Sequence, residues 1–326
     1  MVHAKTSSCR IGVVGVGSFG ARHAARYSEL AEADLAVVCD VDAERARSTA
    51  AQLGVGWTTD YRDLIGSVDA VSIAVPTNLH FEVSRHFLER GVHVLVEKPI
   101  CDSLADADAL IELAAARQLV LQVGHLERFN PVVEAMLSMV DRPKRIDARR
   151  ISTNRSSDKR TNVTLDLMIH DLDLVFQLFP GAVRSIRATT DPLIGDADSH
   201  VSAHIEFGDG CVANIVASWV GTAAERTMSI IQPDSTVVAD LKNTRLSLLR
   251  ASPQGGEANG DVAGKTTSFA SNTSLERQLR SFVRAVRHAE MPVVTGLDGR
   301  RALEAALAVI AGLEAGSGSD ESFRAA

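Results

Sequence analysis

The 326-residue sequence is poor in cysteine and has no long apolar run. Its four cysteines lie far apart and form no C-x-x-C pair, so we expect a reducing cytoplasm, with no disulfide framework and no metal site. No apolar stretch approaches the roughly 18 residues of a membrane span. Met1 to Arg10 contains neither the apolar segment nor the cleavage site of a secretory signal, so we expect no membrane association.

Basic charge is also in deficit, with 34 Lys and Arg against 41 Asp and Glu and a net charge of −7. This balance excludes a general nucleic-acid binder, although it leaves room for a local basic pocket. Hydrophobic residues make up 45% and charged residues 23%, which is typical of a globular protein. The length predicts two domains or one large domain.

The N-terminal third of the chain alternates short apolar runs with segments of helical spacing. The predicted strands are Ile11–Gly15, Leu35–Cys39, Ala70–Val75, His93–Val96 and Val120–Val123. The predicted helices are Phe19–Leu30, Ala43–Leu53, His80–Arg90 and Leu104–Arg117. This alternation predicts an α/β domain of the doubly wound Rossmann type, with a parallel sheet covered on both faces.

The rhythm changes from about Arg145, where strand-like segments follow one another with tight turns such as Gly208-Asp209-Gly210. The predicted strands are Arg145–Ser152, Val183–Thr189, Val201–Phe207, Cys211–Ser218, Thr227–Ile231, Thr236–Asp240 and Arg245–Leu249. Three helices, Val163–Phe179, Ser274–Ala289 and Gly299–Leu313, and a surface loop, Pro253–Gly264, complete this part. We therefore expect an α+β domain with a largely antiparallel sheet. The predicted boundaries are 1–125, 126–315 and a disordered tail, 316–326.

A G-x-G-x-x-G motif, Gly15-Val16-Gly17-Ser18-Phe19-Gly20, stands between the first predicted strand and helix. In this context the glycines allow a tight turn, close approach of a pyrophosphate and packing of helix on strand. The pyrophosphate rests on the N–H groups at the helix start. Asp40, at the end of the second predicted strand, is placed to bind the adenosine ribose.

Asp40 also favours NAD over NADP, because its carboxylate repels a 2′-phosphate. The next residues, Val41 and Asp42, supply no cation that would hold that phosphate. Arg45 and Arg47 are within reach in principle, but they lie along the following helix.

Candidate catalytic residues follow in two places. Lys98 comes directly after a parallel strand, at the edge where such sheets bind ligands, and is predicted to act as acid or base beside the nicotinamide. The alternative is a surface lysine before a turn. On one continuous helix, Asp166, His170, Asp173 and Gln177 share a stripe about 60° wide. An acid–histidine stripe on an apolar helix is costly unless it lines a polar cavity or pairs internally, so Asp166 and His170 are predicted active-site residues.

Several neighbouring residues keep two interpretations. Asp173 is either functional or part of a structural network, whereas Asp171 points elsewhere and is predicted to be structural. His125 and Arg128 follow another strand and are predicted to contact substrate. Asn130 is either a ligand contact or the cap of a helix that begins at Pro131. A basic segment precedes the histidine helix and suits a nucleotide diphosphate, or else is a solvated loop: Arg149, Arg150, Arg155, Lys159 and Arg160.

Together these motifs resemble the Gfo/Idh/MocA family of nicotinamide-dependent sugar oxidoreductases over about residues 10–315. The resemblance rests on the glycine motif, Pro76-Thr77-Asn78-Leu79-His80, Glu97-Lys98-Pro99 and the Asp166/His170 pair. It implies a Rossmann domain that binds the cofactor and a second domain that holds substrate and forms a homo-dimer or homo-tetramer. Lys98, Asp166 and His170 match the family's catalytic residues. The cofactor set is Gly15, Gly17, Ser18, Phe19, Gly20, Asp40, Pro76, Thr77, Asn78, His80, Glu97 and Lys98. The substrate set is His125, Arg128, Asn130, Arg155, Asp166 and His170.

Within that family, residues 124–131 and 166–173 are similar to UDP-N-acetylglucosamine 3-dehydrogenases. This similarity implies NAD-dependent oxidation of the sugar C3 hydroxyl to a ketone, which a separate aminotransferase converts toward 2,3-diamino sugars of lipid A-type glycolipids. The alternative is a dehydrogenase or reductase of a free polyol or sugar, such as an inositol. A regulatory protein without chemistry needs none of Lys98, Asp166 and His170. We favour His170 as proton acceptor with Lys98 polarising the alkoxide, and the opposite assignment stays open, as do the exact sugar nucleotide and the direction in the cell.

Overall fold

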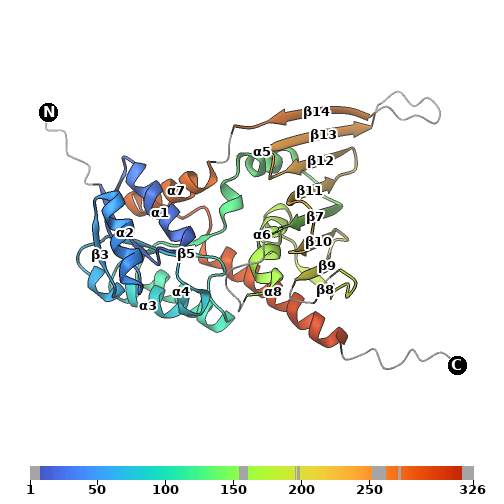
Figure 1. Ribbon diagram of the computed structural model, residues 1–326. Coiled ribbons are helices and arrows are strands. Elements are labelled where there is room, and N and C mark those ends of the chain that lie inside the picture. Colours follow the sequence, from blue (N-terminus) through green and yellow to red (C-terminus); the bar gives the residue numbers. More distant parts are fainter. Residues whose placement is uncertain are drawn as a thin grey trace, which may run out of the picture. The chain divides into compact units, whose positions relative to one another are not determined.

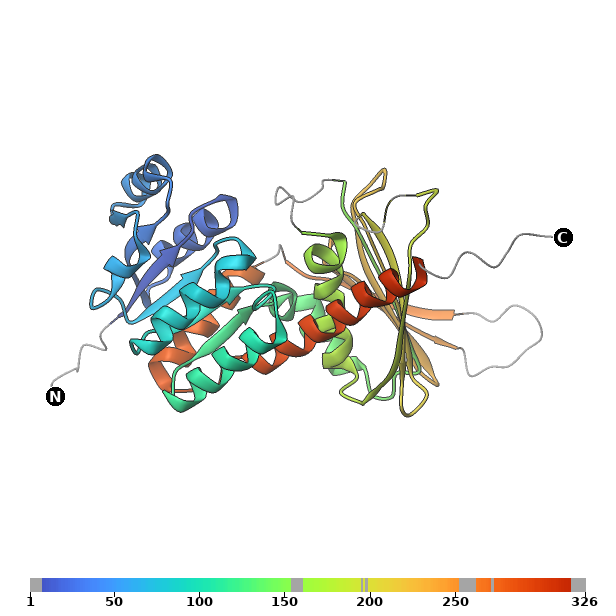
Figure 2. The ribbon, with the colours of Figure 1, turned by 90° about the horizontal axis from the view of Figure 1, so that it is seen from below.

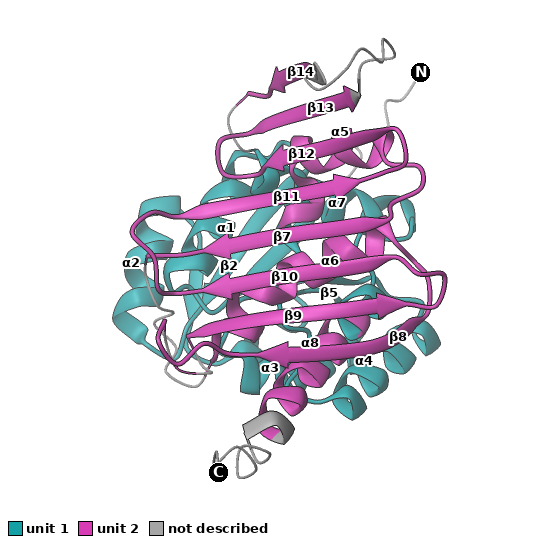
Figure 3. Cartoon of the chain, turned by 90° about the vertical axis from the view of Figure 1, so that its right-hand side faces the viewer, with its two compact units in different colours: residues 1–126, 273–300 teal, residues 127–272, 301–326 magenta. Residues whose placement is uncertain are grey.

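The computed structural model describes residues 8–153, 161–194, 196, 199–251, 262–270 and 273–317. The chain divides into two compact units, drawn in two colours in Figure 3. Unit 1 contains Met1–Leu126 and Thr273–Arg300, and unit 2 contains Glu127–Asn272 and Arg301–Ala326. The domain boundaries predicted from the sequence place Thr273–Arg300 in the second domain, but in the structure this segment belongs to unit 1. None of the helices in the described part of the chain is long and apolar enough to cross a membrane.

Unit 1 is built on a parallel sheet with the strand order β3-β2-β1-β4-β5-β6, as predicted for a doubly wound fold. Its strands are β1 Cys9–Val14, β2 Ala33–Cys39, β3 Gly56–Thr58, β4 Ala70–Ile73, β5 His93–Glu97 and β6 Leu121–Gly124. Its helices are α1 Ser18–Glu29, α2 Ala43–Leu53, α3 His80–Glu89, α4 Leu104–Ala116 and α7 Ser274–His288. Short 3₁₀ turns are η1 Tyr61–Leu64, η2 Thr77–Leu79 and η3 Leu126–Phe129, the last of which crosses into unit 2.

Helix α7 joins unit 1 because its apolar face completes the core of that unit. Leu279 and Phe282 of α7 pack with Ile11 of β1 and Tyr27 of α1, and α7 lies beside α1 in Figure 1. The segment after α7 also returns to the sheet, since Thr295 forms an antiparallel bridge with Gln122 at the outer edge of β6. Helix α8, Gly296–Ser317, then runs as one uninterrupted helix (Figure 2) whose first residues belong to unit 1 and whose later residues belong to unit 2.

Unit 2 contains a sheet with the order β14-β13-β12-β11-β7-β10-β9-β8. Among the described strands of this sheet, only β7 and β10 pair in parallel, so the predicted, largely antiparallel sheet is confirmed. The strands are β7 Arg145–Ile151, β8 Val183–Thr189, β9 His200–Phe207, β10 Val212–Ser218, β11 Glu225–Ile231, β12 Ser235–Asp240, β13 Arg245–Ala251 and β14 Val262–Ser268.

Helices α5 (Pro131–Met139), α6 (Ile169–Leu178) and the later part of α8 lie against one face of this sheet, behind the strands in Figure 3. The core between helices and sheet contains Val133 of α5, Leu172 of α6 and Val309 of α8. Along β9 the side chains alternate between buried and half-buried, as expected when one face of a sheet carries the core.

Three features differ from the sequence prediction. The edge strands β3 and β14 were not predicted, and β14 begins inside the predicted loop Pro253–Gly264. The predicted helix Val163–Phe179 consists of a π-helical turn, η4 Thr164–Met168, followed by α6. Helix α8 includes the first two residues of the predicted tail 316–326, and the rest of that tail lies outside the described residues.

All four cysteines are free and buried. Burial raises the pKa of the Cys39 thiol to about 12, and it raises the pKa of Cys101 to about 12 as well. Both thiols are therefore protonated at neutral pH and behave as small core residues.

Candidate active site

The three motif glycines meet three different surroundings in the structure. Gly15 has φ +83°, and a Cβ there would lie 2.7 Å from the Ala74 carbonyl oxygen, so the turn requires glycine. A Cβ on Gly20 would lie 1.8 Å from the Gly15 carbonyl oxygen, because α1 packs tightly on the loop. A Cβ on Gly17 would meet no atom within 4 Å. Gly17 therefore faces open space, where a side chain would fill the volume that a ligand needs.

This open space lies at the N-terminus of α1, where the described residues provide no side-chain cap for the first N–H groups. The amides of Ser18 and Phe19 thus begin a helix whose free donors and dipole favour an anion. A pyrophosphate fits this cradle. The geometry supports the predicted role of Gly17, Ser18 and Phe19.

Asp40 follows β2 and is 6% exposed. Its Oδ2 accepts a hydrogen bond from the backbone N–H of Val16 at 2.9 Å, which ties the acid to the glycine loop. Its Oδ1 accepts from the backbone N–H of Asp42 at 3.0 Å. The Arg45 guanidinium also donates to both oxygens, at 3.1 and 3.2 Å. The sequence places the acid at the ribose position, but it did not predict that Arg45 pairs with it.

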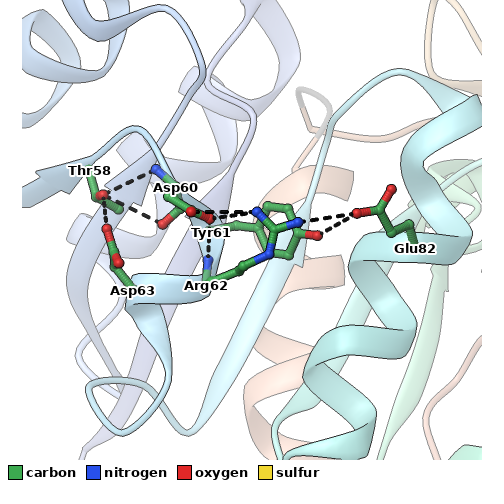
Figure 4. Close-up of polar contacts among 6 residues, drawn as sticks. All are labelled: Thr58, Asp60, Tyr61, Arg62, Asp63 and Glu82. Atoms are coloured by element: carbon green, nitrogen blue, oxygen red, sulfur yellow. Dashed lines mark hydrogen bonds and ion pairs between the residues drawn. The ribbon is translucent and has the colours of Figure 1, made fainter.

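A polar cluster at the end of β3 supports this corner (Figure 4). The backbone N–H of Asp40 donates to the carbonyl oxygen of Thr58 at 3.3 Å, and Thr58 Oγ1 donates to Asp63 at 2.7 Å. Tyr61 donates its hydroxyl to Glu82 of α3 at 2.8 Å, and Figure 4 shows the two side chains pointing toward one another. These contacts connect the β3 corner to α3 and fix the backbone next to Asp40.

The loop after β4 contains the predicted cofactor residues Pro76, Thr77 and Asn78, which are exposed or half-buried. His80 differs, because it is buried and its ring lies between two backbone carbonyls. Its Nδ1 lies 2.8 Å from the Pro99 oxygen, and its Nε2 lies 2.9 Å from the Val75 oxygen. His80 thus connects the loop after β4 with the loop after β5.

Glu97 and Lys98 stand at the carboxyl end of β5. Lys98 is half-buried, whereas Glu97 is 9% exposed. The Glu97 carboxylate lies 3.3 Å from Nε2 of His23 and accepts from Nε2 of Gln278 at 3.4 Å. A Cβ on Gly124 would lie 2.4 Å from a Glu97 oxygen, so glycine makes room for this carboxylate. A buried network from α1 and α7 therefore fixes the residue that precedes Lys98.

Asp166 lies in the π turn of unit 2, and His170 lies in the first turn of α6; both are half-buried. Asp166 Oδ2 accepts a hydrogen bond from Nε1 of Trp219 at 3.1 Å. π-turns inside helices occur frequently at functional sites. The wider turn also changes the angular positions that a uniform α-helix would give Asp166 and His170, so the predicted stripe is not regular.

Asp173 is a structural residue rather than a second acid of the site. It is 1% exposed and accepts two hydrogen bonds from Arg128, at 2.7 and 2.8 Å. The Arg128 side chain, predicted to contact substrate, is 8% exposed and forms this bidentate pair with Asp173.

A second buried cluster contains Asp171, which confirms its predicted structural role. Asp171 pairs with Arg150 at 2.8 and 2.9 Å, and Arg150 also donates to Glu127 at 2.9 Å. Burial opposes ionisation of Glu127, but the neighbouring Arg150 and the Asn130 amide hold its pKa below the usual range. Arg150 is therefore occupied in the core, while Arg149 points outward to Glu225.

The remaining predicted substrate residues divide as follows. Asn130 caps α5, because its Oδ1 accepts from the backbone N–H of Val132 at 3.0 Å and its Nδ2 donates to Glu127 at 3.1 Å. Both polar ends are thus engaged, as the capping alternative requires. His125 is 1% exposed and belongs to unit 1. Arg155, Lys159 and Arg160 lie outside the described residues.

The predicted site residues are divided between the two units. Unit 1 holds the cofactor set and Lys98, and unit 2 holds Asp166 and His170. Among the described residues, no group of three or more His, Cys, Asp and Glu side chains could hold a metal ion.

Residues 9–125 match the Gfo/Idh/MocA oxidoreductase family, NAD-binding Rossmann fold, and residues 134–238 match the Gfo/Idh/MocA C-terminal domain. The UDP-N-acetylglucosamine 3-dehydrogenase of Acidithiobacillus ferrooxidans is 33% identical over 97% of this chain and 99% of that protein. A solved structure of that enzyme matches with a TM-score of 0.86 and 32% identity, over 95% of this chain and 99% of the other. The scyllo-inositol 2-dehydrogenase (NAD(+)) of Bacillus subtilis is 27% identical over 92% of each chain.

The chain belongs to the Gfo/Idh/MocA family of oxidoreductases. It is a dehydrogenase of that family, and its cofactor is NAD.

Proposed function

We propose that the protein oxidises the C3 hydroxyl of UDP-N-acetylglucosamine to the 3-keto sugar nucleotide. The observation that carries this proposal is the 33% identity to a UDP-N-acetylglucosamine 3-dehydrogenase across 97% of the chain. The similarity of residues 124–131 and 166–173 to such enzymes supports the same proposal. The half-buried Asp166 and His170, at a π turn, supply the acid–base pair that such an oxidation needs.

Each catalytic residue has a distinct role in this proposal. Bound NAD supplies the hydride acceptor. An imidazole nitrogen of His170 accepts the hydroxyl proton, and Asp166 orients the ring while Trp219 fixes the Asp166 carboxylate. Lys98 polarises the developing alkoxide and aids proton exit. In the opposite assignment Lys98 accepts the hydroxyl proton and His170 polarises the alkoxide, and the same number of protons is transferred.

Binding and cellular context belong to the same proposal. Arg155 binds the diphosphate of the UDP-sugar, and His125 and Arg128 belong to the substrate region. An aminotransferase consumes the ketone toward a 2,3-diamino sugar of lipid A-type glycolipids, without a stable complex. The protein acts in the cytoplasm as a homo-dimer or homo-tetramer, and the sheet face of unit 2 seen in Figure 3, on which no described helix of that unit lies, suits such an association.

A free polyol is the second candidate substrate, because the scyllo-inositol 2-dehydrogenase of Bacillus subtilis is 27% identical over 92% of each chain. A panel of UDP-sugars and inositols, each incubated with the pure protein and NAD, separates the two. We expect NADH to form with UDP-N-acetylglucosamine and not with inositols. Equal or faster turnover of an uncharged polyol would replace the sugar-nucleotide proposal with the polyol one.

A further inference from the structure

Arg45, on the first turn of α2, lies against the carboxylate that receives the adenosine ribose. Its Nη1 lies 3.1 and 3.2 Å from the two oxygens of Asp40, and its Nη2 lies 3.1 Å from Oδ2 of Asp42. The Arg45 side chain is 48% exposed, whereas that of Asp40 is 5% exposed. One cation is thus held by two carboxylates at the ribose position of the Rossmann fold.

The hydrogen bonds of Asp40 are already fully used in this arrangement. A carboxylate offers about four acceptor positions. The backbone N–H groups of Val16 and Asp42 occupy two of them, and Arg45 approaches both oxygens. The ribose hydroxyls of NAD can donate to Asp40 only when Arg45 moves away from at least one oxygen. Arg45 therefore competes with NAD for Asp40.

Toward NADP the same side chain acts in the opposite sense. A 2′-phosphate is repelled by Asp40, but it offers oxygens that match the planar fork of a guanidinium. Arg45 already lies beside the ribose position, and its half-exposed side chain can turn from Asp40 to the phosphate. Arg47, two residues further along α2, pairs with Glu44 instead.

We propose that the NAD preference is set by the Asp40–Arg45 pair rather than by Asp40 alone, with Arg45 as a specificity-determining residue. Arg45 weakens the NAD complex by occupying Asp40. It becomes the anchor of the 2′-phosphate when the charge of Asp40 is removed. The proposal concerns the cofactor alone and does not depend on which sugar is oxidised.

Titration calorimetry with NAD and NADP on five variants tests this proposal. Arg45→Met is expected to tighten NAD binding, because the competitor for Asp40 is gone, and to weaken NADP binding by roughly 10-fold, since one charge-assisted contact is lost. Asp40→Ser is expected to tighten NADP binding by at least about 10-fold, and the double variant Asp40→Ser/Arg45→Met to lose that gain. Arg47→Met is the matched control on the same helix and should keep the wild-type ratio of the two Kd values.

Asp40→Asn accompanies the serine variant, because it keeps an oxygen acceptor for Val16 if the loop does not tolerate serine. The Arg45-dependent part of NADP binding should also shrink at high salt, as expected for a half-exposed cation. The proposal is overturned if Arg45→Met leaves the Kd ratio unchanged, or if loss of the Asp40 charge tightens NADP equally with and without Arg45.

Discussion

Two glycines of one motif, Gly17 and Gly20, place different demands on the chain. Gly17 has an extended backbone with φ −62°, which any residue adopts, and its Cβ direction is open. We expect Gly17→Val to fold with a Tm close to wild type and to lose NAD binding, because the side chain fills the pyrophosphate space. Gly20→Ala is the contrasting variant, since its Cβ would collide with the Gly15 carbonyl and should lower the Tm. Retention of wild-type NAD affinity by Gly17→Val would show that the pyrophosphate lies elsewhere.

The two proton-handling residues can be tested separately from cofactor binding. His170→Ala and Lys98→Met should each lower kcat by ~10²–10⁴-fold, because each removes a positioned acid–base group. The Kd for NAD should stay near the wild-type value. His204→Ala is a control, since His204 is a half-exposed histidine of β9 that pairs with Asn214. Near-normal turnover in both His170→Ala and Lys98→Met would mean that the catalytic site is misplaced.

At the scale of the elements, strand β7 carries two adjacent arginines that are expected to contribute very different amounts to the free energy of unfolding. Arg150 is 3% exposed and pairs with the buried Asp171 and Glu127, whereas Arg149 pairs with Glu225 at the surface. Arg150→Met leaves the buried Asp171 without its cation and leaves Glu127 with only the longer Arg226 pair at 3.6 Å, so it should lower the free energy of unfolding by ~3–5 kcal/mol. Arg149→Met should cost less than about 1 kcal/mol. Urea unfolding of both variants measures the difference, and equal values would contradict the buried network.

His80, which connects the ends of β4 and β5, makes the stability of the fold depend on pH. Burial lowers the pKa of His80 below its usual range, against the Pro99 and Val75 carbonyls, which favour the protonated ring. The unfolded chain therefore takes up a proton near pH ~6.5 that the folded chain does not, so stability is lost as the pH falls below that value. Melting curves from pH 8 to pH 5.5 should show a steeper loss of Tm for wild type than for His80→Gln. An equal loss of Tm for wild type and His80→Gln would show that His80 does not cause the pH dependence.

Most elements could be predicted from the sequence because their signals are local. Ala43–Leu53 and Val183–Thr189 were predicted with the boundaries that the structure gives, since helical spacing and turn residues bound them clearly. β3 and β14 were missed because their local signals are weak. The first has three residues, Gly56–Thr58, and the second has few apolar side chains.

Prediction of the candidate site from the sequence is likewise limited to residues that have a local signal. Glycines, Asp40 and Lys98 are identified by their places relative to strands, which the sequence pattern supplies. The π turn at Thr164–Met168 has no such pattern, so Asp166 and His170 were found through residue type while their regular stripe was wrong. The partners of Arg128 and Arg150 lie more than twenty positions away, and single-sequence periodicity carries no information on such pairs.

At the scale of the whole molecule, the chain leaves unit 1 after Leu126 and returns to it with Thr273–Arg300. The pattern of α7 predicts a buried face, but it does not say which core that face joins. Leu279 and Phe282 settle this in the structure by packing with β1 and α1. The family's two matched regions, residues 9–125 and 134–238, likewise leave this returning segment unassigned.

If this chain moves a hydride from C3 of UDP-N-acetylglucosamine to NAD, as we propose, the hydrogen of that carbon appears in the reduced cofactor. The most direct measurement is a reaction with UDP-N-acetylglucosamine that carries deuterium at C3, followed by mass spectrometry of the cofactor and of the sugar nucleotide. We expect deuterium in the reduced cofactor, a 3-keto sugar nucleotide and a slower rate than with the unlabelled substrate. Reduced cofactor without deuterium, or no reduction with this substrate while an inositol is oxidised, would contradict the account.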